Sequence, residues 1–513
     1  MKWLTWCITT SLILIVSSAD THAFRKPKRI SHLYVSHFEN VLGTSLELKI
    51  SASSKYDATA AENAALHEIS RMAKILSAYE ANSEFSCWLR TLGQPVHISP
   101  ELFEVLNLFD RWRLRSNGAL DASAEVINKL WKQAAAKNLL PTKEELAHAV
   151  SEVQQPHWKL DSATQTATHL SNAPLKLNSF TKSYIIKHAA DAAMASGKVN
   201  AIVVNIGGDL VVTGDLSETV EISNPMADAE NEAPLDQLLV SKRAVATSGN
   251  YRRGELINGQ WYSHIVDPRT GKPADNIVTA TVVAPSATDA GALATAFNVM
   301  SPAEIVKLAA TLPEAEYLII TKNGERISSK GWSSLEVPAK SLNDFRANAN
   351  GKGLVRSMWK NDFELLINLE INLQKEGFVK RPYVAVWVED ENHAAVRTIS
   401  VWHGRDRYLP ELKSWYLKYR EAYNTDKNFN NSVTSATRSA GKYKLKWDGQ
   451  DDKGNFVKPG KYIIKIEASR EHGTYQLIRQ EIDLDETPKL INLAGNIEIA
   501  SASLDYRKKT DSN

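Results

Sequence analysis

The pattern of apolar residues changes near residue 343, and this change limits the chain to folds with two separate cores. Before it, residues 46–50 alternate apolar and polar side chains like a half-buried strand, and residues 58–79 carry apolar positions at helical spacing. After it, short extended pieces such as residues 383–388 and 462–466 dominate. A chain of 513 residues also exceeds the size of one hydrophobic core. We therefore expect an α+β domain at residues 24–340, a linker at residues 341–355 and a smaller all-β domain at residues 356–513.

The N-terminal segment has the three-part layout of a secretory signal peptide. Lys2 precedes a mostly apolar run at residues 3–16, and Thr21-His22-Ala23 forms an acceptable cleavage site before Phe24. A membrane anchor is the alternative, but the apolar run is shorter than the roughly 20 residues that a spanning helix needs. No later stretch is long and apolar enough to span a bilayer either. Residues 1–23 therefore predict export, and we expect a periplasmic protein without an integral membrane segment in its mature form.

Charge and cysteine content narrow the function further. Lys and Arg number 61 against 59 Asp and Glu, so the net charge of +2 predicts no broad basic surface and excludes nucleic acid as an expected partner.

Cys7 lies in the signal segment, which leaves Cys87 alone in the mature chain. An oxidising compartment such as the periplasm permits disulfides, but a mature chain with one cysteine cannot form an internal one.

Several short motifs in the first domain place glycine, hydroxyl, acidic and histidine side chains where the chain leaves a strand. Taken singly, each is weak: a Gly-Gly pair is more often a turn than a ligand site, and a lone histidine is more often structural than catalytic. Asp267-Pro268 with Thr270-Gly271 is an adequate turn without any chemistry. The motifs are Gly43-Thr44, Tyr79 with Ser83-Glu84, Asp121-Ala122-Ser123, Lys182-Ser183-Tyr184, Gly207-Gly208-Asp209, residues 247–251, residues 264–271 and residues 292–296.

In this order the motifs resemble the ApbE-like FAD:protein FMN transferases, from about Gly43 to Met300. The resemblance implies flavin binding in a cleft of an α+β domain, Mg²⁺-dependent cleavage of the FAD pyrophosphate, and transfer of FMN to a threonine of an acceptor flavoprotein in an exported or membrane electron-transfer system. FAD and Mg²⁺ are the implied substrate and metal. By the family pattern Tyr79 packs on the flavin ring and Asp267 supports the His264 loop. The implied FAD contacts are Tyr79, Ala119, Leu120, Asp121, Lys182, Gly207, Gly208, Asp209, Ser248, Gly249 and His264.

The residue types fit this chemistry. Glycines allow backbone N–H groups to approach phosphate closely, and a divalent cation offsets the charge of a pyrophosphate. A threonine hydroxyl is a weak nucleophile, so a nearby base assists it. We assign the role of base to His264 as a hypothesis, with Asp267 as the second catalytic residue.

Two segments depart from the family pattern. The metal-binding segment usually reads Ala-Asp-Ala-Leu-x-Thr-Ala, and this chain retains Thr295 but has Gly291 in place of the aspartate. We expect Asp289 either to cap the helix, alone or with Thr288, or to reach the metal beside Thr295 if the chain is not yet helical there. The lysine segment usually reads Gly-Gly-x-Ala-Lys-Gly-Tyr with a later aspartate, whereas residues 178–184 read Asn-Ser-Phe-Thr-Lys-Ser-Tyr and Lys187 stands at the aspartate's place.

The C-terminal domain resembles immunoglobulin-like domains of exported bacterial proteins and the DUF2271 type. Trp402, Trp415 and Tyr416 favour core packing over a docking surface. The aspartates of residues 448–452 match no established Ca²⁺ loop and predict a solvated turn. Two alternatives to an active transferase remain: a non-catalytic flavin-binding protein that has lost its metal carboxylate, and an adaptor whose β-domain recruits a membrane redox partner.

Overall fold

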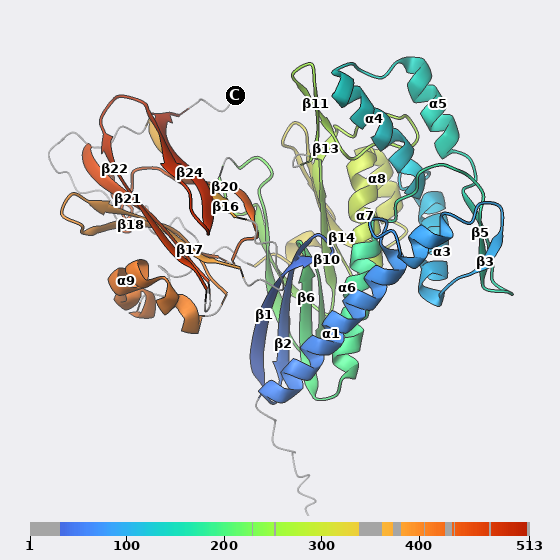
Figure 1. Cartoon of the computed structure of the whole chain (residues 1–513), viewed down its shortest axis with the longest axis horizontal. Coiled ribbons are helices and arrows are strands. Elements are labelled where there is room, and N and C mark those ends of the chain that lie inside the picture. Colours follow the sequence, from blue (N-terminus) through green and yellow to red (C-terminus); the bar gives the residue numbers. More distant parts are fainter. Residues whose placement is uncertain are drawn as a thin grey trace, which may run out of the picture.

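Two regions of regular structure make up the protein (Figure 1). The computed structural model describes residues 31–227, 229–250, 253–337, 362–372, 381–404, 406–425, 433–435, 437–470 and 473–509. The predicted signal peptide, the predicted linker and Tyr251 lie outside these residues. None of the helices within these ranges combines the length and the apolar character needed to cross a bilayer.

The first domain is built on one eight-stranded sheet whose neighbouring strands all run antiparallel. This sheet confirms the predicted α+β class, because an α/β fold would need parallel strands joined by crossover helices. In spatial order its strands are β1 (His32–Val41), β2 (Thr44–Ala52), β6 (Val199–Ile206), β7 (Asp209–Gly214), β10 (Ala244–Gly249), β13 (Ile277–Ala284), β14 (Glu316–Thr321) and β15 (Arg326–Ser328).

Helices cover one face of this sheet and bury its apolar side chains. The helix α1 (Lys55–Leu76) starts at Ser54, whose side chain accepts from the Asp57 N–H, and its buried residues recur at helical spacing. It packs with α6 (Thr181–Ala195) and α7 (Ala287–Val299) into the main core. The further helices on this side are α2 (Glu84–Trp88), α3 (Pro100–Arg115), α4 (Glu125–Lys137), α5 (Lys143–Val153) and α8 (Pro302–Ala309).

Smaller sheets complete the first domain. Strands β8 (Ser217–Ile222) and β9 (Asp236–Ser241) form a hairpin whose apolar residues join a second core on the opposite face of the large sheet. Strands β3 (Pro95–His97), β5 (Thr166–His169) and β4 (Trp158–Asp161) form a three-stranded sheet beside α3. Strands β11 (Gly254–Ile257) and β12 (Gln260–Ser263) form a hairpin that leads directly into His264.

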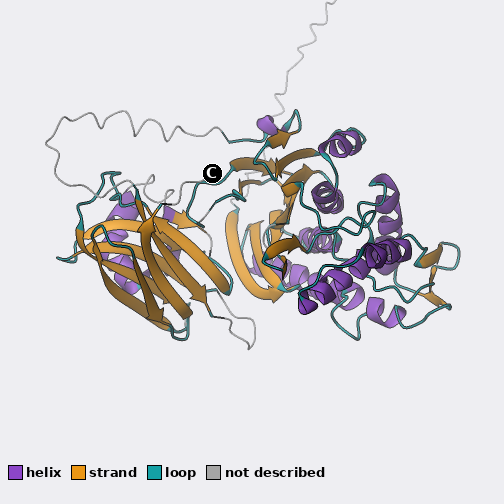
Figure 2. Cartoon of the chain, turned by 90° about the horizontal axis from the view of Figure 1, so that it is seen from above, coloured by secondary structure: helices purple, strands orange, loops and turns teal. Residues whose placement is uncertain are grey.

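The second domain consists of two sheets that enclose a common core, which confirms its predicted all-β character apart from one helix (Figure 2). The immunoglobulin-like assignment stays a prediction. The helix α9 (Lys413–Thr425) covers the outer face of the larger sheet, where Trp415 is fully buried. Trp402 is buried as well, so core packing is confirmed for both tryptophans. The strands are β16 (Phe363–Ile371), β17 (Tyr383–Asp390), β18 (Ala395–Trp402), β19 (Thr434–Ser435), β20 (Gly441–Trp447), β21 (Gly460–Ser469), β22 (Tyr475–Leu484), β23 (Lys489–Ala494) and β24 (Ile499–Lys508).

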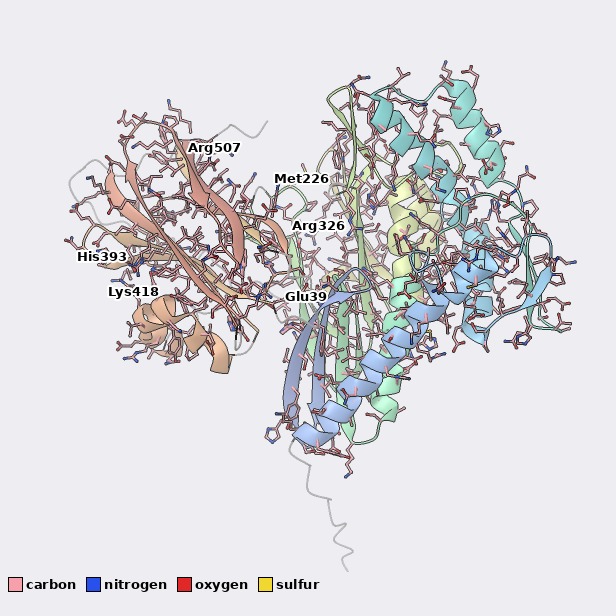
Figure 3. The ribbon with its side chains drawn as sticks, in the orientation of Figure 1. Glu39, Met226, Arg326, His393, Lys418 and Arg507 are labelled. Carbon is pink, nitrogen blue, oxygen red and sulfur yellow. The ribbon has the colours of Figure 1, made fainter. Side chains whose placement is uncertain are left out.

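The two domains meet through polar and charged contacts. The first domain's loop at residues 229–232 lies beside β20, the end strand of the four-stranded sheet: the Glu230 N–H donates to the Lys444 carbonyl at 2.7 Å, and Asn231 exchanges two hydrogen bonds with the Lys446 backbone. Lys446 pairs with Glu232 at 2.7 Å, and Arg381 pairs with Glu39, which Figure 3 labels at the boundary. The loop thereby covers an otherwise unpaired sheet edge.

Candidate functional site

The turn between β6 and β7 is formed by Gly207 and Gly208, and we call it the glycine turn. Both residues have positive φ, 60° and 95°, which favours glycine over any L-residue. A Cβ on Gly207 would lie 2.7 Å from Thr44 Cγ2, and the Gly207 N–H donates to the Ser45 carbonyl at 2.9 Å. The fold therefore brings the predicted Gly43-Thr44 and Gly207-Gly208 motifs into direct contact.

Lys182 and Asp209 join three of the predicted motifs. Lys182 lies in the first turn of α6, and its Nζ is 2.8 Å from Asp209 Oδ2 at the start of β7. The other oxygen, Oδ1, accepts from the Thr247 N–H of β10 at 3.2 Å. Because the lysine side chain is about one third exposed, its ammonium group remains accessible to an anionic ligand while Asp209 holds it in place.

The strand end at Ser248 and Gly249 is partly exposed, and the Ser248 carbonyl contacts helix α7. Asn298 of α7 is buried, and its Nδ2 donates to the Ser248 carbonyl at 2.7 Å. This contact ties the backbone of the predicted 247–251 motif to α7. Asn298 was not among the predicted site residues, since its position on an apolar helix gives no signal of a long-range hydrogen bond.

Tyr79 lies after the end of α1 with three quarters of its surface exposed, as suits a ring that packs on a planar ligand. Its hydroxyl accepts from Asn178 Nδ2 at 2.8 Å, and Lys176 Nζ lies 5.4 Å from its ring centroid. Lys176 also pairs with Glu125 at 2.9 Å. Sequence reasoning missed Lys176 and Glu125, which belong to no motif.

The segment at residues 119–121 is more deeply buried than a ligand-contacting segment would be. Ala119 and Leu120 point into the main core, so only their backbones are available to a ligand. Asp121 Oδ1 accepts from the Ser123 N–H and hydroxyl, and Oδ2 pairs with Arg113 Nε at 2.9 Å. These contacts give Asp121 a structural task, and its predicted contact with FAD stays a prediction.

A pocket of about 300 Å³ connects this segment to the loop at residues 264–271. Its walls come from the end of α3, from the α5 end and from the loop. A Cβ on Gly118 would lie 3.4 Å from Arg269 Cγ, so the two predicted motifs are neighbours. The lining residues are Arg113, Leu114, Asn117, Gly118, Asp121, Val153, Gln154, Pro268 and Arg269.

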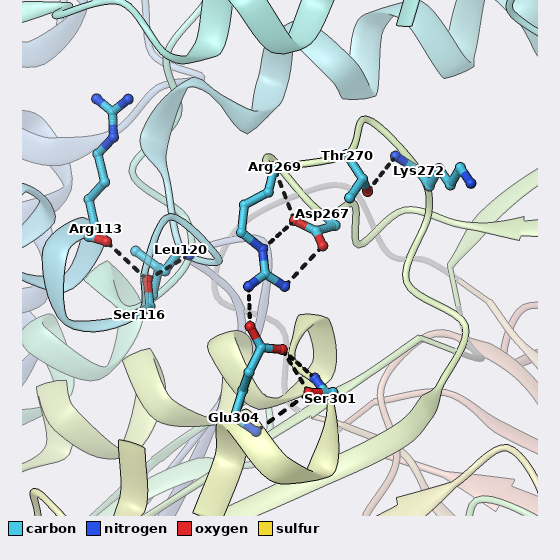
Figure 4. Close-up of polar contacts among 9 residues, drawn as sticks. All are labelled: Arg113, Ser116, Leu120, Asp267, Arg269, Thr270, Lys272, Ser301 and Glu304. Atoms are coloured by element: carbon cyan, nitrogen blue, oxygen red, sulfur yellow. Dashed lines mark hydrogen bonds and ion pairs between the residues drawn. The ribbon is translucent and has the colours of Figure 1, made fainter. Parts of the chain in front are cut away.

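Asp267 is bound closely by Arg269 (Figure 4). Its Oδ1 accepts from the Arg269 backbone N–H and Nε, both at 2.9 Å, and its Oδ2 accepts from an Arg269 terminal nitrogen at 3.0 Å. The other terminal nitrogen of Arg269 donates to Glu304 Oε1 at 2.5 Å. Glu304 also accepts from the backbone N–H of Ser301, the N-cap of α8, and so completes the capping box of that helix. The hydrogen bonds from Arg269 to the Asp267 carboxylate raise the pKa of Arg269, which keeps the guanidinium group charged. Asp267 is therefore a positioning residue for the His264 loop in this structure.

His264 follows β12 and is held by the backbone of Arg253. Its Nδ1 lies 2.9 Å from the Arg253 carbonyl, and because a carbonyl only accepts, Nδ1 carries the hydrogen and Nε2 has the lone pair. The residue is exposed overall, yet loss of water around the ring lowers the pKa of His264, and the charges of Arg253 and Lys132 act in the same direction. The imidazole is thus neutral near pH 7 and available as a base at Nε2.

Asp289 and Thr295, the predicted metal pair, both lie on helix α7. This helix begins at Ala287 and is capped by Ser286, whose hydroxyl accepts from the Asp289 N–H at 3.2 Å. The capping expectation is therefore wrong, since neither Asp289 nor Thr288 caps the helix. The chain is already helical at Asp289, so the condition under which its carboxylate was expected to reach the metal is not met. Six positions apart on a helix, Asp289 and Thr295 point about 120° away from each other. Thr295 instead donates to the Ser179 carbonyl at 2.9 Å. In the described part of the chain, no three His, Cys, Asp or Glu side chains gather as a metal site.

Each of the two domains matches a known family. Residues 42–319 match the ApbE family, and residues 364–501 match a family described as "Predicted periplasmic protein (DUF2271)". The FAD:protein FMN transferase of Vibrio cholerae is 30% identical over 237 residues, covering 44% of this chain and 69% of that protein. The Escherichia coli K12 enzyme of the same name is 26% identical over 274 residues, or 51% and 76% of the two chains.

Solved structures show the same fold. The crystal structure of the ApbE protein from Thermotoga maritima superposes with a TM-score of 0.53 at 25% identity, covering 60% of this chain and all of that one. The flavin transferase ApbE from Vibrio cholerae superposes with a TM-score of 0.51 at 22% identity, with the same coverage of both chains.

Proposed function

The chain is an enzyme of the ApbE family, and we propose that it transfers FMN from FAD to a threonine hydroxyl of an exported or membrane redox protein. The observation that carries the proposal is the Lys182–Asp209 pair beside the glycine turn, which joins elements from three separate motifs. These parts offer a fixed ammonium group and a turn that tolerates close approach of a ligand, the features that a dinucleotide pyrophosphate requires.

In this proposal FAD contacts the site at two places. The exposed ring of Tyr79 packs on the flavin ring, and Asn178 and Lys176 hold the tyrosine in position. The pyrophosphate lies near Lys182 and the glycine turn, where the ammonium group offsets its charge. Ser248, whose carbonyl is held by Asn298, and the adjacent Gly249 complete the predicted contacts.

The transfer step uses His264 as base. The threonine oxygen of the acceptor forms a bond to the FMN phosphorus, the P–O bond to AMP breaks, and its electron pair leaves on AMP. The hydroxyl proton passes to His264 Nε2, which is the lone-pair nitrogen because Nδ1 is engaged by the Arg253 carbonyl. Asp267 and Arg269 hold the loop that carries the histidine.

Mg²⁺ is implied by the family resemblance, but Gly291 stands where the family pattern has the metal carboxylate, and within the described residues no three His, Cys, Asp or Glu side chains gather as a metal site. We therefore assign no step of the transfer to a metal ion. Lys182 is the side chain next to the glycine turn that can offset the charge of the pyrophosphate.

The setting we propose is the periplasm. Support comes from the signal-like layout of residues 1–23 and from the description of the family that matches residues 364–501. An acceptor in the same compartment would be an exported electron-transfer protein or the exported part of a membrane one.

The test is AMP release from FAD by the purified chain without residues 1–23, with and without a threonine-containing acceptor protein. The proposal expects AMP and covalently bound FMN in equal amounts when the acceptor is present. Absence of FAD binding under all conditions would refute the flavin function altogether.

A second function is favoured by one specific observation, the absence of a carboxylate at Gly291. A flavin-binding protein without transfer activity would keep Tyr79, Lys182 and the glycine turn but release no AMP. Tight FAD binding without AMP release, in the presence of acceptor, would select this alternative.

A further inference from the structure

The helices α6 and α7 lie close together at Gly291. A Cβ built on Gly291 would overlap Ser183 Oγ and would lie 3.0 Å from Ser183 Cβ and 3.4 Å from Phe180 Cα. Gly291 is buried, so a side chain there would enter the space that Ser183 fills. A residue larger than glycine at position 291 therefore requires Ser183 to move.

Ser183 is itself unusual for its surroundings. It is 3% exposed, and within the described residues its Oγ has no hydrogen-bond partner. A buried hydroxyl without a partner costs free energy, so its presence calls for a reason. The reason the geometry offers is volume, because Ser183 fills the space that opens when position 291 lacks a side chain.

At both positions the side chain of this chain differs in size from that of the ApbE pattern: it is larger at Ser183 and smaller at Gly291. The pattern has glycine after the lysine, where this chain has Ser183, and aspartate before Ala-Leu-x-Thr, where this chain has Gly291. In this chain the larger side chain of the contact lies on α6, whereas in the pattern it lies on α7. Neither position alone reveals this exchange, since they lie 108 residues apart in the sequence and meet only in the fold.

The exchange also removes charge from the site. Thr295 lies four positions after Gly291 on the same face of α7, and its hydroxyl is engaged by the Ser179 carbonyl. The oxygens that Thr295, Ser179 and Ser183 bring to this contact belong to hydroxyl and carbonyl groups, whereas Mg²⁺ is usually held through at least one carboxylate. The neighbouring charges, Lys182 and Asp209, neutralise each other.

We infer that Ser183 and Gly291 form a compensating pair that replaces a divalent-cation site by a neutral contact between α6 and α7, so that this chain holds FAD without a cation there. The part that concerns FAD rests on the proposed flavin function. The part that concerns the pair stands on the packing of the two helices alone.

A stability cycle tests the pair without any ligand. Gly291→Asp should lower the melting temperature of the full chain by about 2–8 °C, because the new side chain enters filled space. Adding Ser183→Gly should recover at least half of that loss. Gly291→Asp with an unchanged melting temperature, or without recovery in the double variant, would overturn the compensation.

Calorimetric titration with MgCl₂ alone tests the loss of the cation site. The wild type and Ser183→Gly should take up no Mg²⁺, whereas the Gly291→Asp/Ser183→Gly variant should bind it. Stoichiometric uptake by the wild type that Thr295→Ala abolishes would overturn the inference. Absence of uptake by the double variant would overturn the assignment of the loss to these two positions.

FAD affinity then links the pair to function. The wild-type dissociation constant in EDTA should stay within about twofold of its value in MgCl₂, and a loss of about tenfold or more in EDTA would contradict the inference. If the wild type binds FAD under neither condition, the flavin function fails, while the stability cycle and the MgCl₂ titration still decide whether the pair replaces a cation site.

Discussion

Lys182 and Ser183 are neighbours in the first turn of α6, but they face two different regions of the site. Lys182 faces the glycine turn, where its charge is balanced by Asp209 and remains accessible. Ser183 faces Gly291 of α7, where the contact is buried and uncharged. The two side chains therefore lie on separate sides of one helix, so the contact on one side can change while the ion pair on the other is kept.

We call the Lys182–Asp209 pair with the glycine turn the charged region, and the Ser183–Gly291 contact the neutral region. If the charged region and the His264 loop carry the chemistry, removal of the base should have the largest effect on the transfer rate. We expect His264→Ala to lower the rate of AMP release with acceptor by about 100-fold or more, since general-base catalysis contributes on this order. FAD affinity should change less than the rate, because the Nδ1 atom of His264 is held by the Arg253 carbonyl and the proposed base is Nε2. Stopped assays of AMP would measure the rate, and a variant as fast as the wild type would exclude His264 as base.

The same histidine should set the pH dependence of transfer. Its pKa is lowered from the ordinary value of 6.5 by loss of water around the ring and by the nearby Arg253 and Lys132. Protonation removes the base, so kcat/KM should fall on acidification with a midpoint below 6.5 and stay level above it. The His264→Ala variant serves as control and should lack this limb. A midpoint above 6.5 would contradict the assignment.

Two lysines of α6 allow a comparison between the side of the helix that faces Asp209 and the rest of the helix. Lys182→Ala should weaken FAD binding by about tenfold or more, because it removes a charge-assisted contact and leaves Asp209 uncompensated beside an anionic ligand. Lys187→Ala is the matched control: the Lys187 side chain is 45% exposed and pairs with Asp191 one turn later. Equal losses in both variants, measured by fluorescence titration, would break the distinction between the two regions.

The glycine turn offers a smaller test of the same region, on stability. Gly207→Ala places a Cβ against Thr44 at a positive φ and should cost about 2–4 kcal/mol, whereas Gly208→Ala meets open space and should cost about 1–2 kcal/mol. Urea unfolding of the full chain would measure both. A Gly208 variant as unstable as the Gly207 variant would show that the Thr44 contact is unimportant.

Local pattern was enough to predict the charged region but not the neutral one. The order of short motifs predicted that Lys182, the glycine turn and residues 247–249 share a site, and the fold brings them together. Side-chain pairs between distant segments, such as Ser183 with Gly291, depend on how helices pack, and a sequence period carries no such information. The expectation for Asp289 failed for a related reason, because Ser286 was a competing cap and only the backbone shows which residue begins the helix.

Residues without a motif were missed even where they are central to the site. Lys176 connects Tyr79 to Glu125, and Arg253 fixes the histidine tautomer through its carbonyl. Such contacts are made by backbone atoms or by isolated long side chains, which produce no motif or periodic pattern in the sequence. The buried Asp121 shows the reverse case: its motif was noticed, but its carboxylate is used by Arg113 and Ser123.

A crystal structure of the chain with FAD and Mn²⁺, with anomalous scattering used to locate the manganese, tests the central claim most directly. We predict the flavin ring against Tyr79, the pyrophosphate near Lys182 and the glycine turn, and no manganese between Ser183 and Gly291. Manganese at that contact, bound by Thr295 and the Ser179 carbonyl, would contradict the account.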